Sequence, residues 1–281
     1  MFKKALVALD LSPAELPIIE CLPALQKWGI HQIVLTHVIQ FGYAHGAGLA
    51  HQQEYEDWLK KSAQPLREAG LDVVTEVRAS GVPASEVLKA ADENAADLII
   101  IGSRGQNFLA KLFLGSVARE VIRNTTKPLL LEWIEPTVEA TQANCEAVCT
   151  DTLRQILFAT DFSEHAAAAE QAVLVLAPKA QHTECVHILP AEKTGLSEQD
   201  TATARHAMKE LVARIEAGGG KVTGTVLQGK PSVEIAHHAD SQKATLIVVG
   251  KHGQNWIASK LIGSTAANIC EIAARPVLMV P

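Results

Sequence analysis

The sequence predicts an α/β fold built from two tandem doubly wound domains, each with a five-stranded parallel sheet. The first observation is a repeat, because the motifs of the N-terminal half return in the C-terminal half of the 281 residues. The second is that short apolar runs alternate with helical patterns inside each half. The third is that residues 98–101 and 246–249 are apolar throughout, which is typical of strands covered on both faces.

The elements of the first half follow from this pattern. Helices are expected between the apolar runs, and Pro83 and its counterpart Pro231 stand where the first turn of a helix tolerates proline. Gly218–Gly220 marks the end of a helix in the second half. The predicted strands of the first half are Ala5–Leu9, Ile33–Val38, Leu71–Val77, Leu98–Ile101 and Leu129–Leu131.

The domain boundaries are set by a break in this alternation. Residues 134–151 are polar and weakly periodic, and they contain Cys145 and Cys149. We therefore expect domains at 1–133 and 152–281, joined by a linker at 134–151. An odd total of five cysteines argues against a disulfide scaffold and favours reduced thiols.

Composition narrows the classes of partner. The formal net charge is −6 and no basic block occurs, which disfavours nucleic acid as a partner. No run of 18 apolar residues occurs, so no membrane-spanning helix is expected. The start "MFKKALVALD" is better interpreted as a first strand than as a signal peptide, and the cytoplasm is the expected location.

One motif occurs twice with the same spacing. "GSRGQNFLAKLFLGS" begins at Gly102 and "GKHGQNWIASKLIGS" begins at Gly250, and both read G-x2-G-x9-G-S. Each motif should run from the end of a strand to the start of a helix, where free N–H groups and the helix dipole attract anions. Glycines let the backbone approach such a ligand closely. Turn glycines and helix caps are the alternative interpretation, although it explains the repeated spacing less well.

These residues make the chain resemble the universal stress protein family in its tandem two-domain form. "VALDLS" and "FATDFS" at the first strands, "GVPASEV" and "GKPSVEI", and above all the two G-x2-G-x9-G-S motifs carry the resemblance, which covers nearly all of both halves. It implies a Rossmann-like fold of the adenine nucleotide alpha hydrolase type. The ATP-binding members of the family show the same glycine motif, so ATP, ADP or AMP is the implied ligand, possibly together with Mg²⁺.

The resemblance also implies a role for particular residues. An acid at the end of the first strand lies against adenosine, a hydrophobic residue after the second strand offers its backbone to adenine, and the motif residues hold ribose and phosphates. Arg104 and His252, like Lys111 and Lys260, could neutralise phosphate charge or be ordinary solvated side chains. The implied nucleotide-binding residues are Asp10, Val38, Gly102, Arg104, Gly105, Gly115 and Ser116 in the first half, and Asp161, Ile188, Gly250, His252, Gly253, Gly263 and Ser264 in the second.

The chain departs from the family pattern inside both motifs. Many members have a further glycine in the nine-residue gap, where this chain has Phe108 and Trp256. We expect this change to stiffen the loops and to weaken binding, more so at Trp256. Asp10 and Asp161 have a structural alternative, because an acid at a strand end can cap the next helix.

Three functions remain open at this stage. The leading one is an ATP-binding protein of the stress response that acts through ligand-dependent conformation. The second is a slow ATPase or an autophosphorylating enzyme using Ser116 or Ser264, for which the sequence offers no general base, no catalytic residue and no metal site. The third is a nucleotide-free dimerising scaffold or a binder of another small molecule.

The last strand of each half suggests how the halves assemble. "KPLLLEW" and "RPVLMVP" would each leave an open sheet edge, and family members commonly dimerise through this strand. We therefore expect an internal pseudo-dimer of the two halves, and a homodimer of whole chains is conceivable.

Overall fold

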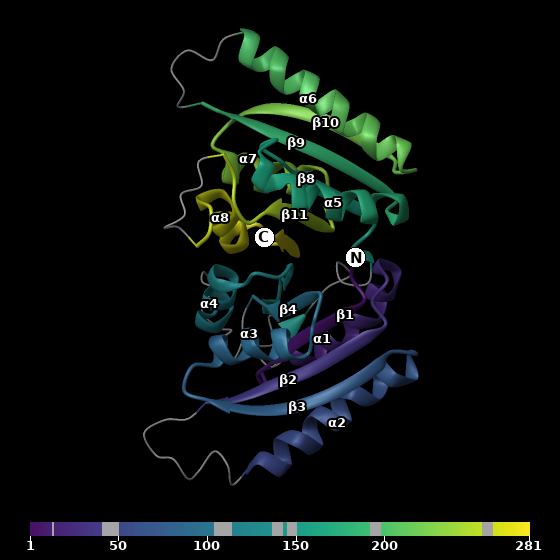
Figure 1. Cartoon of the computed structure of the whole chain (residues 1–281), viewed down its shortest axis with the longest axis vertical. Coiled ribbons are helices and arrows are strands. Elements are labelled where there is room, and N and C mark those ends of the chain that lie inside the picture. Colours follow the sequence, from purple (N-terminus) through teal and green to yellow (C-terminus); the bar gives the residue numbers. More distant parts are fainter. Residues whose placement is uncertain are drawn as a thin grey trace. The chain divides into compact units, whose positions relative to one another are not determined.

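The computed structural model describes residues 1–12, 14–40, 51–103, 114–136, 143–144, 151–191, 198–254 and 261–281. The chain divides into two compact units, residues 1–150 and 151–281. The division falls at the C-terminal end of the expected linker, and each unit contains five parallel strands (Figure 1).

The first unit has five parallel strands in the order β3-β2-β1-β4-β5. Every predicted strand is present, and the observed bounds differ from the predicted ones by at most three residues. The elements are β1 (Lys4–Leu9), α1 (Glu15–Cys21), the 3₁₀ helix η1 (Leu22–Trp28), β2 (Gln32–Gln40), α2 (Gln52–Glu68), β3 (Asp72–Ser80), α3 (Pro83–Glu93), β4 (Leu98–Gly102), α4 (Ser116–Asn124) and β5 (Leu129–Glu132).

The second unit repeats this plan with the order β10-β9-β8-β11-β12, again all parallel. Figure 1 shows α6 lying along β10, as α2 lies along β3 in the first unit. The elements are β8 (Gln155–Ala159), η4 (Glu164–Ala166), α5 (Ala167–Leu176), η5 (Ala177–Lys179), β9 (His182–Pro190), α6 (Glu198–Ala217), β10 (Val222–Gly229), α7 (Pro231–Ser241), β11 (Leu246–Gly250), α8 (Ser264–Ile272) and β12 (Val277–Val280).

The sequence signals explain these elements. All residues of β4 and β11 are buried, as expected for central strands covered on both faces. Pro83 and Pro231 open α3 and α7, where the N–H that proline lacks would have had no intrahelical partner. Helix α6 ends at Ala217, immediately before the predicted glycine stop.

Residues of the two units correspond at an offset that is fixed within each element and changes by one or two between elements. Gly70 and Gly219 follow α2 and α6 with φ of +88° and +89°, and they are 149 positions apart. Strand register agrees, because His37 pairs with Val77 as His187 pairs with Val226. Near β1 and β8 the offset is 151, since Ala5 and Ile156 pair with the matched residues Leu98 and Leu246 of β4 and β11.

The predicted linker contains a short ladder that the sequence did not indicate. Glu135–Pro136 (β6) and Ala143–Asn144 (β7) pair in antiparallel fashion. Two paired residues per strand are too few for a periodic sequence signal, which is why the segment looks irregular in the sequence.

The cysteines differ in part from the prediction. Cys185 and Cys270 are buried free thiols, and burial raises the pKa of each to about 12, so both are inert. Cys21 is disulfide-bonded, so the prediction of reduced thiols is wrong for this residue. An odd total argues against a full disulfide framework but does not exclude one bridge. Cys145 and Cys149 lie outside the described residues.

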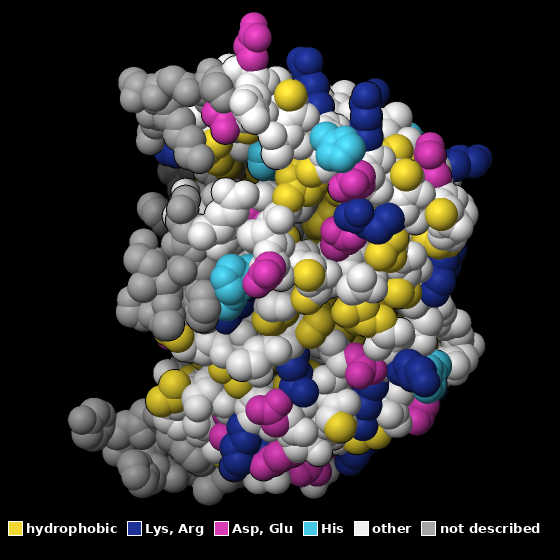
Figure 2. Space-filling view, turned by 45° about the horizontal axis from the view of Figure 1, so that its top comes forward, with side chains coloured by type: hydrophobic (Ala, Val, Ile, Leu, Met, Phe, Trp, Pro, Cys, Tyr) yellow, Lys and Arg dark blue, Asp and Glu magenta, His cyan; other side chains and the backbone are white. Residues whose placement is uncertain are grey.

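Two surface properties bear on partners. Among the described residues, no helix is both long and apolar enough to cross a membrane. On the face shown in Figure 2, acidic and basic side chains are interspersed, with no extended basic patch of the kind that binds nucleic acid.

Candidate functional site

The strand order of each unit predicts a crevice at the carboxyl ends of its central strands. In the second unit, β8 is flanked by β9 on one side and β11 on the other, so the chain winds outward in two directions from this point. The loops that leave the carboxyl ends of such neighbouring strands diverge, and ligands of open α/β sheets bind between them.

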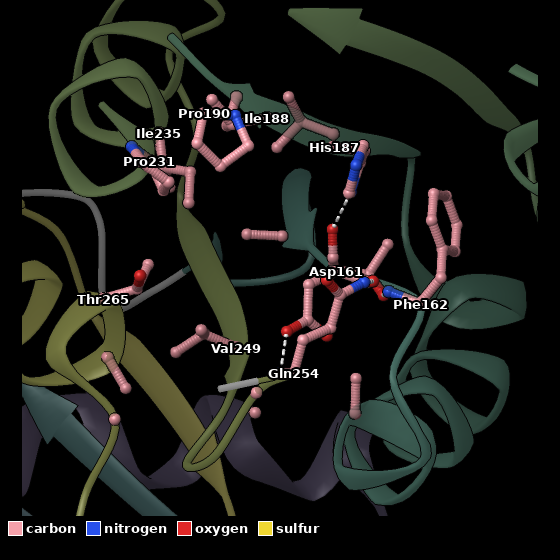
Figure 3. A pocket seen from close by; sticks show the side chains of 18 of the residues that line it. Asp161, Phe162, His187, Ile188, Pro190, Pro231, Ile235, Val249, Gln254 and Thr265 are labelled. Atoms are coloured by element: carbon pink, nitrogen blue, oxygen red, sulfur yellow. Dashed lines mark hydrogen bonds between the residues drawn. The ribbon is translucent and has the colours of Figure 1, made fainter. Parts of the chain in front are cut away.

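The second unit has a cavity of about 500 Å³ at this place (Figure 3). Its walls come from the carboxyl ends of β8, β9 and β11, from α6, and from the first turns of α7 and α8. All seven residues predicted for nucleotide binding in the second half line it: Asp161, Ile188, Gly250, His252, Gly253, Gly263 and Ser264.

Asp161 ties the end of β8 to the glycine loop. One carboxylate oxygen, Oδ1, accepts hydrogen bonds from the Ser163 backbone N–H at 3.0 Å and from the Ser163 hydroxyl at 2.7 Å. The other, Oδ2, accepts from the backbone N–H of Gln254 at 2.7 Å. The Gln254 side chain donates in turn to the Asp161 carbonyl (Figure 3). Asp161 is not a helix cap, because α5 follows η4 and begins only at Ala167.

Gly253 is required by this arrangement. A Cβ atom at Gly253 would collide with Asp161 Oδ2, the oxygen that accepts from Gln254. Any larger residue would therefore displace either the Asp161 carboxylate or the loop, and in both cases the bond from Gln254 to Asp161 Oδ2 would be disturbed. The sequence singled out both residues separately, but only the structure shows that they are packed against each other.

The N-terminus of α8 forms another wall. Gly263 is the N-cap and Ser264 is the first helical residue, so the motif serine follows the cap instead of providing it. The N–H of Gly263 donates to the Lys251 carbonyl at 2.9 Å, and the Gly263 carbonyl accepts from Ala267. The N–H groups of the first helical turn have no intrahelical acceptor, so this end of the helix attracts an anion.

The other residues that line the cavity are partly polar and partly apolar. His187 Nδ1 donates to the Thr160 carbonyl at 2.8 Å, and its ring lies 4.8 Å from that of Phe162. Ile188 and Pro190 follow His187 along β9, and Ile235 of α7 lies beside them (Figure 3). The sequence analysis did not include Phe162, His187, Gln254 or Thr265 in the site. His187 and Gln254 had a signal, since they match His37 and Gln106 of the first half, whereas Phe162 and Thr265 had none.

The basic residues of the motif differ in the charge they carry. Burial lowers the pKa of His252, and repulsion from Lys251 and His165 lowers it further. A hydrogen bond of 3.2 Å from His252 to the Leu261 carbonyl opposes this shift. His252 is therefore neutral at pH 7. Burial also lowers the pKa of Lys251, to about 8. Lys260 lies outside the described residues.

The predicted residues of the first unit occupy matching places. Asp10 follows β1 and accepts from the Ser12 N–H at 3.1 Å, Gly102 ends β4, Gly115 is the N-cap of α4, and Ser116 opens that helix. Val38 lies inside β2, which ends at Gln40, two residues later than predicted. Ile188 likewise lies inside β9, which continues to Pro190. Arg104, Gly105, Phe108 and Lys111, like Trp256 in the second unit, are outside the described residues.

Comparison with known proteins identifies the family. The model of the universal stress protein family matches residues 1–131 and again residues 152–281. The chain belongs to the universal stress protein family. It carries two domains of that family in tandem, as the sequence predicts.

Individual relatives agree with this assignment. Universal stress protein Slr1230 of Synechocystis is 28% identical over 224 residues, which is 78% of this chain and 69% of that protein. Universal stress protein MJ0531 of Methanocaldococcus jannaschii is 39% identical over 80 residues, 28% of this chain and 46% of the relative. The crystal structure of a universal stress protein from Archaeoglobus fulgidus has the same fold, with a TM-score of 0.76 at 22% identity over 99% of this chain and 95% of that one.

Proposed function

We propose that the second universal stress protein domain binds an adenine nucleotide, with ATP as the preferred ligand, in the cavity at the carboxyl ends of β8, β9 and β11. The observation that carries this proposal is that one cavity of about 500 Å³ is lined by all seven residues predicted for the second half. Its size falls within the roughly 300–1,000 Å³ range of small-molecule sites.

The chemistry of the walls favours one orientation of the ligand. The phosphates belong at Gly263, Ser264 and Thr265, where the first-turn N–H groups of α8 and its dipole attract negative charge. The nucleoside belongs on the side of Asp161 and the apolar wall around Ile188, because a carboxylate can accept from sugar hydroxyls. Mg²⁺ would arrive with the triphosphate.

Asp161 also supplies a reason for binding to change conformation. Its Oδ2 is engaged by the Gln254 N–H, so a ribose hydroxyl that takes this acceptor competes with the bond that holds the glycine loop. A ligand shifts a conformational equilibrium only through such differential contacts. We therefore propose a regulatory protein of the stress response whose loop position reports bound nucleotide.

Calorimetric titration tests the proposal with ATP, ADP, AMP and GTP, each with and without Mg²⁺. We expect ATP to bind and GTP to bind at least tenfold more weakly. The apolar wall offers no polar partners for the polar groups of guanine. The absence of heat and of any ATP-induced thermal shift at millimolar ATP would contradict it. Phosphate release during prolonged incubation would favour a slow ATPase instead.

A further inference from the structure

The two units differ at three positions around the nucleotide cleft. In the second unit, Ala166, Ala204 and Ala207 are among the residues that line the cavity. The offset of 151 near the first strands matches Ala166 to Glu15. The offset of 149 along α2 and α6 matches Ala204 to Tyr55 and Ala207 to Trp58. Small side chains that leave space in one unit are thus replaced by three large ones in the other.

Two of these large side chains in the first unit, Glu15 and Trp58, are hydrogen-bonded to each other. The Trp58 indole Nε1–H donates to both carboxylate oxygens of Glu15, at 2.7 and 2.8 Å. The hydroxyl of Ser62, one turn further along α2, donates to Glu15 Oε1 at 2.6 Å. Glu15 is only half-buried, yet burial raises the pKa of its carboxyl group and these hydrogen bonds oppose the shift. The bonds hold the Trp58 ring between α1 and α2.

The same aromatic rings cover the histidine at the mouth of the cleft. His37 Nδ1 donates to the Leu9 carbonyl at 2.9 Å, just as His187 donates to the Thr160 carbonyl in the second unit. The ring of Tyr55 lies 4.8 Å from His37, and that of Trp58 lies 5.4 Å away, edge to face. In the second unit the residues at these places are alanines that face open cavity.

We propose that Glu15, Tyr55 and Trp58 close the nucleotide cleft of the first domain, so that the chain binds one adenine nucleotide, in the second domain, and not two. This inference rests on the proposed function of the second domain. It differs from the expectation that both glycine motifs hold phosphate. A ligand could enter the first cleft only by displacing two aromatic rings, and it would also meet the carboxyl group of Glu15 near Asp10.

The test counts bound ATP in the wild-type chain and in a variant that restores the alanines of the second domain, Glu15→Ala with Tyr55→Ala and Trp58→Ala. We expect one ATP per wild-type chain and two per variant chain. Gly253→Val, which blocks the second domain, should remove the single wild-type site. Because the variant is expected to gain a site, a folding defect cannot imitate the predicted result.

A second measurement uses the unaltered cleft. The Trp58 indole NMR resonance, assigned with Trp58→Phe, should stay in place when ATP saturates the wild-type chain. Movement of that resonance as the chain saturates overturns the inference, as do two ATP molecules per wild-type chain or a single site that survives Gly253→Val. One ATP in a folded triple variant also overturns it. No binding in either protein overturns the proposed function itself, whereas binding in the triple variant alone overturns only the assignment to the second domain.

Discussion

Asp161 and Gly253 form the contact on which the candidate site depends. The carboxylate needs a close backbone N–H to its Oδ2, and the chain can come that close only without a Cβ at Gly253. This pairing joins two of the predicted residues across 92 positions of sequence, from β8 to the loop after β11. A substitution at position 253 therefore tests this contact directly.

Gly253→Val should weaken ATP binding by at least tenfold and lower the melting temperature by a few degrees, because the new side chain collides with Asp161 Oδ2. Calorimetry and thermal melts measure the two effects. Gly81→Ala is the matched control, since a Cβ there meets nothing within 4 Å. Equal affinity in Gly253→Val and wild type would show that the loop does not contact the ligand.

His252 predicts the sign of the pH dependence of binding. Burial, together with repulsion from Lys251 and His165, lowers its pKa in the free protein from the usual value, and a bound phosphate should raise it. Binding then takes up a proton, so the affinity for ATP should increase as the pH falls from 8 to 6. Titrations in buffers of different ionisation enthalpy would detect the proton, and His252→Gln should lose the uptake. Unchanged uptake in that variant would assign it to the nucleotide or to another group.

At the scale of elements, α4 and α8 are a matched pair. Both have nine residues, begin with serine and have glycine as N-cap. The sequence predicted both starts, because glycine and serine at a helix start have local meaning. It also located all five strands of the first unit, since apolar runs flanked by glycine and proline need no tertiary information.

Ser264→Asp should change stability and ligand affinity in opposite directions. A carboxylate in the first turn of α8 interacts favourably with the helix dipole and should add about 0.3–1 kcal/mol to the unfolding free energy. The same charge repels phosphate, so ATP affinity should fall at least tenfold. Ser116→Asp in α4 should give the stability change without the loss of affinity. If the two variants lost affinity equally, both helices would hold phosphate.

The whole molecule shows what a repeat predicts and what it conceals. Matching residues identified the family and the fold, and they included seven residues that line the cavity of the second unit. Matching residues did not predict the cluster of Glu15, Tyr55 and Trp58, because these three positions differ between the halves. Glu15 and Trp58 are also 43 positions apart in sequence, so their contact is visible only in the fold. The signal is nonetheless present, since alanine stands at all three matched positions of the second half. The expected pairing of the halves and a homodimer of chains stay predictions.

Nucleotide should stabilise the two domains unequally. A single site at a ligand concentration 100 times Kd stabilises its domain by about 2.7 kcal/mol. We expect this gain in denaturant unfolding of the second domain, with the first domain following only to the extent that the two unfold together. Tryptophan fluorescence of Trp58 separates the domains when Trp28, Trp133 and Trp256 are replaced by phenylalanine, in a chain first shown to retain its fold and its ATP affinity.

Hydrogen exchange of the wild-type chain with and without saturating ATP tests the central claim most directly. We predict that amides at 250–254 and 263–267, beside Asp161 in the second domain, exchange more slowly by roughly 100-fold when ATP is present at 100 times Kd. The matching amides at 102–103 and 115–119 of the first domain should not change. Equal protection in both domains would contradict the closed first cleft, and no protection at 250–254 and 263–267 would contradict nucleotide binding in the second.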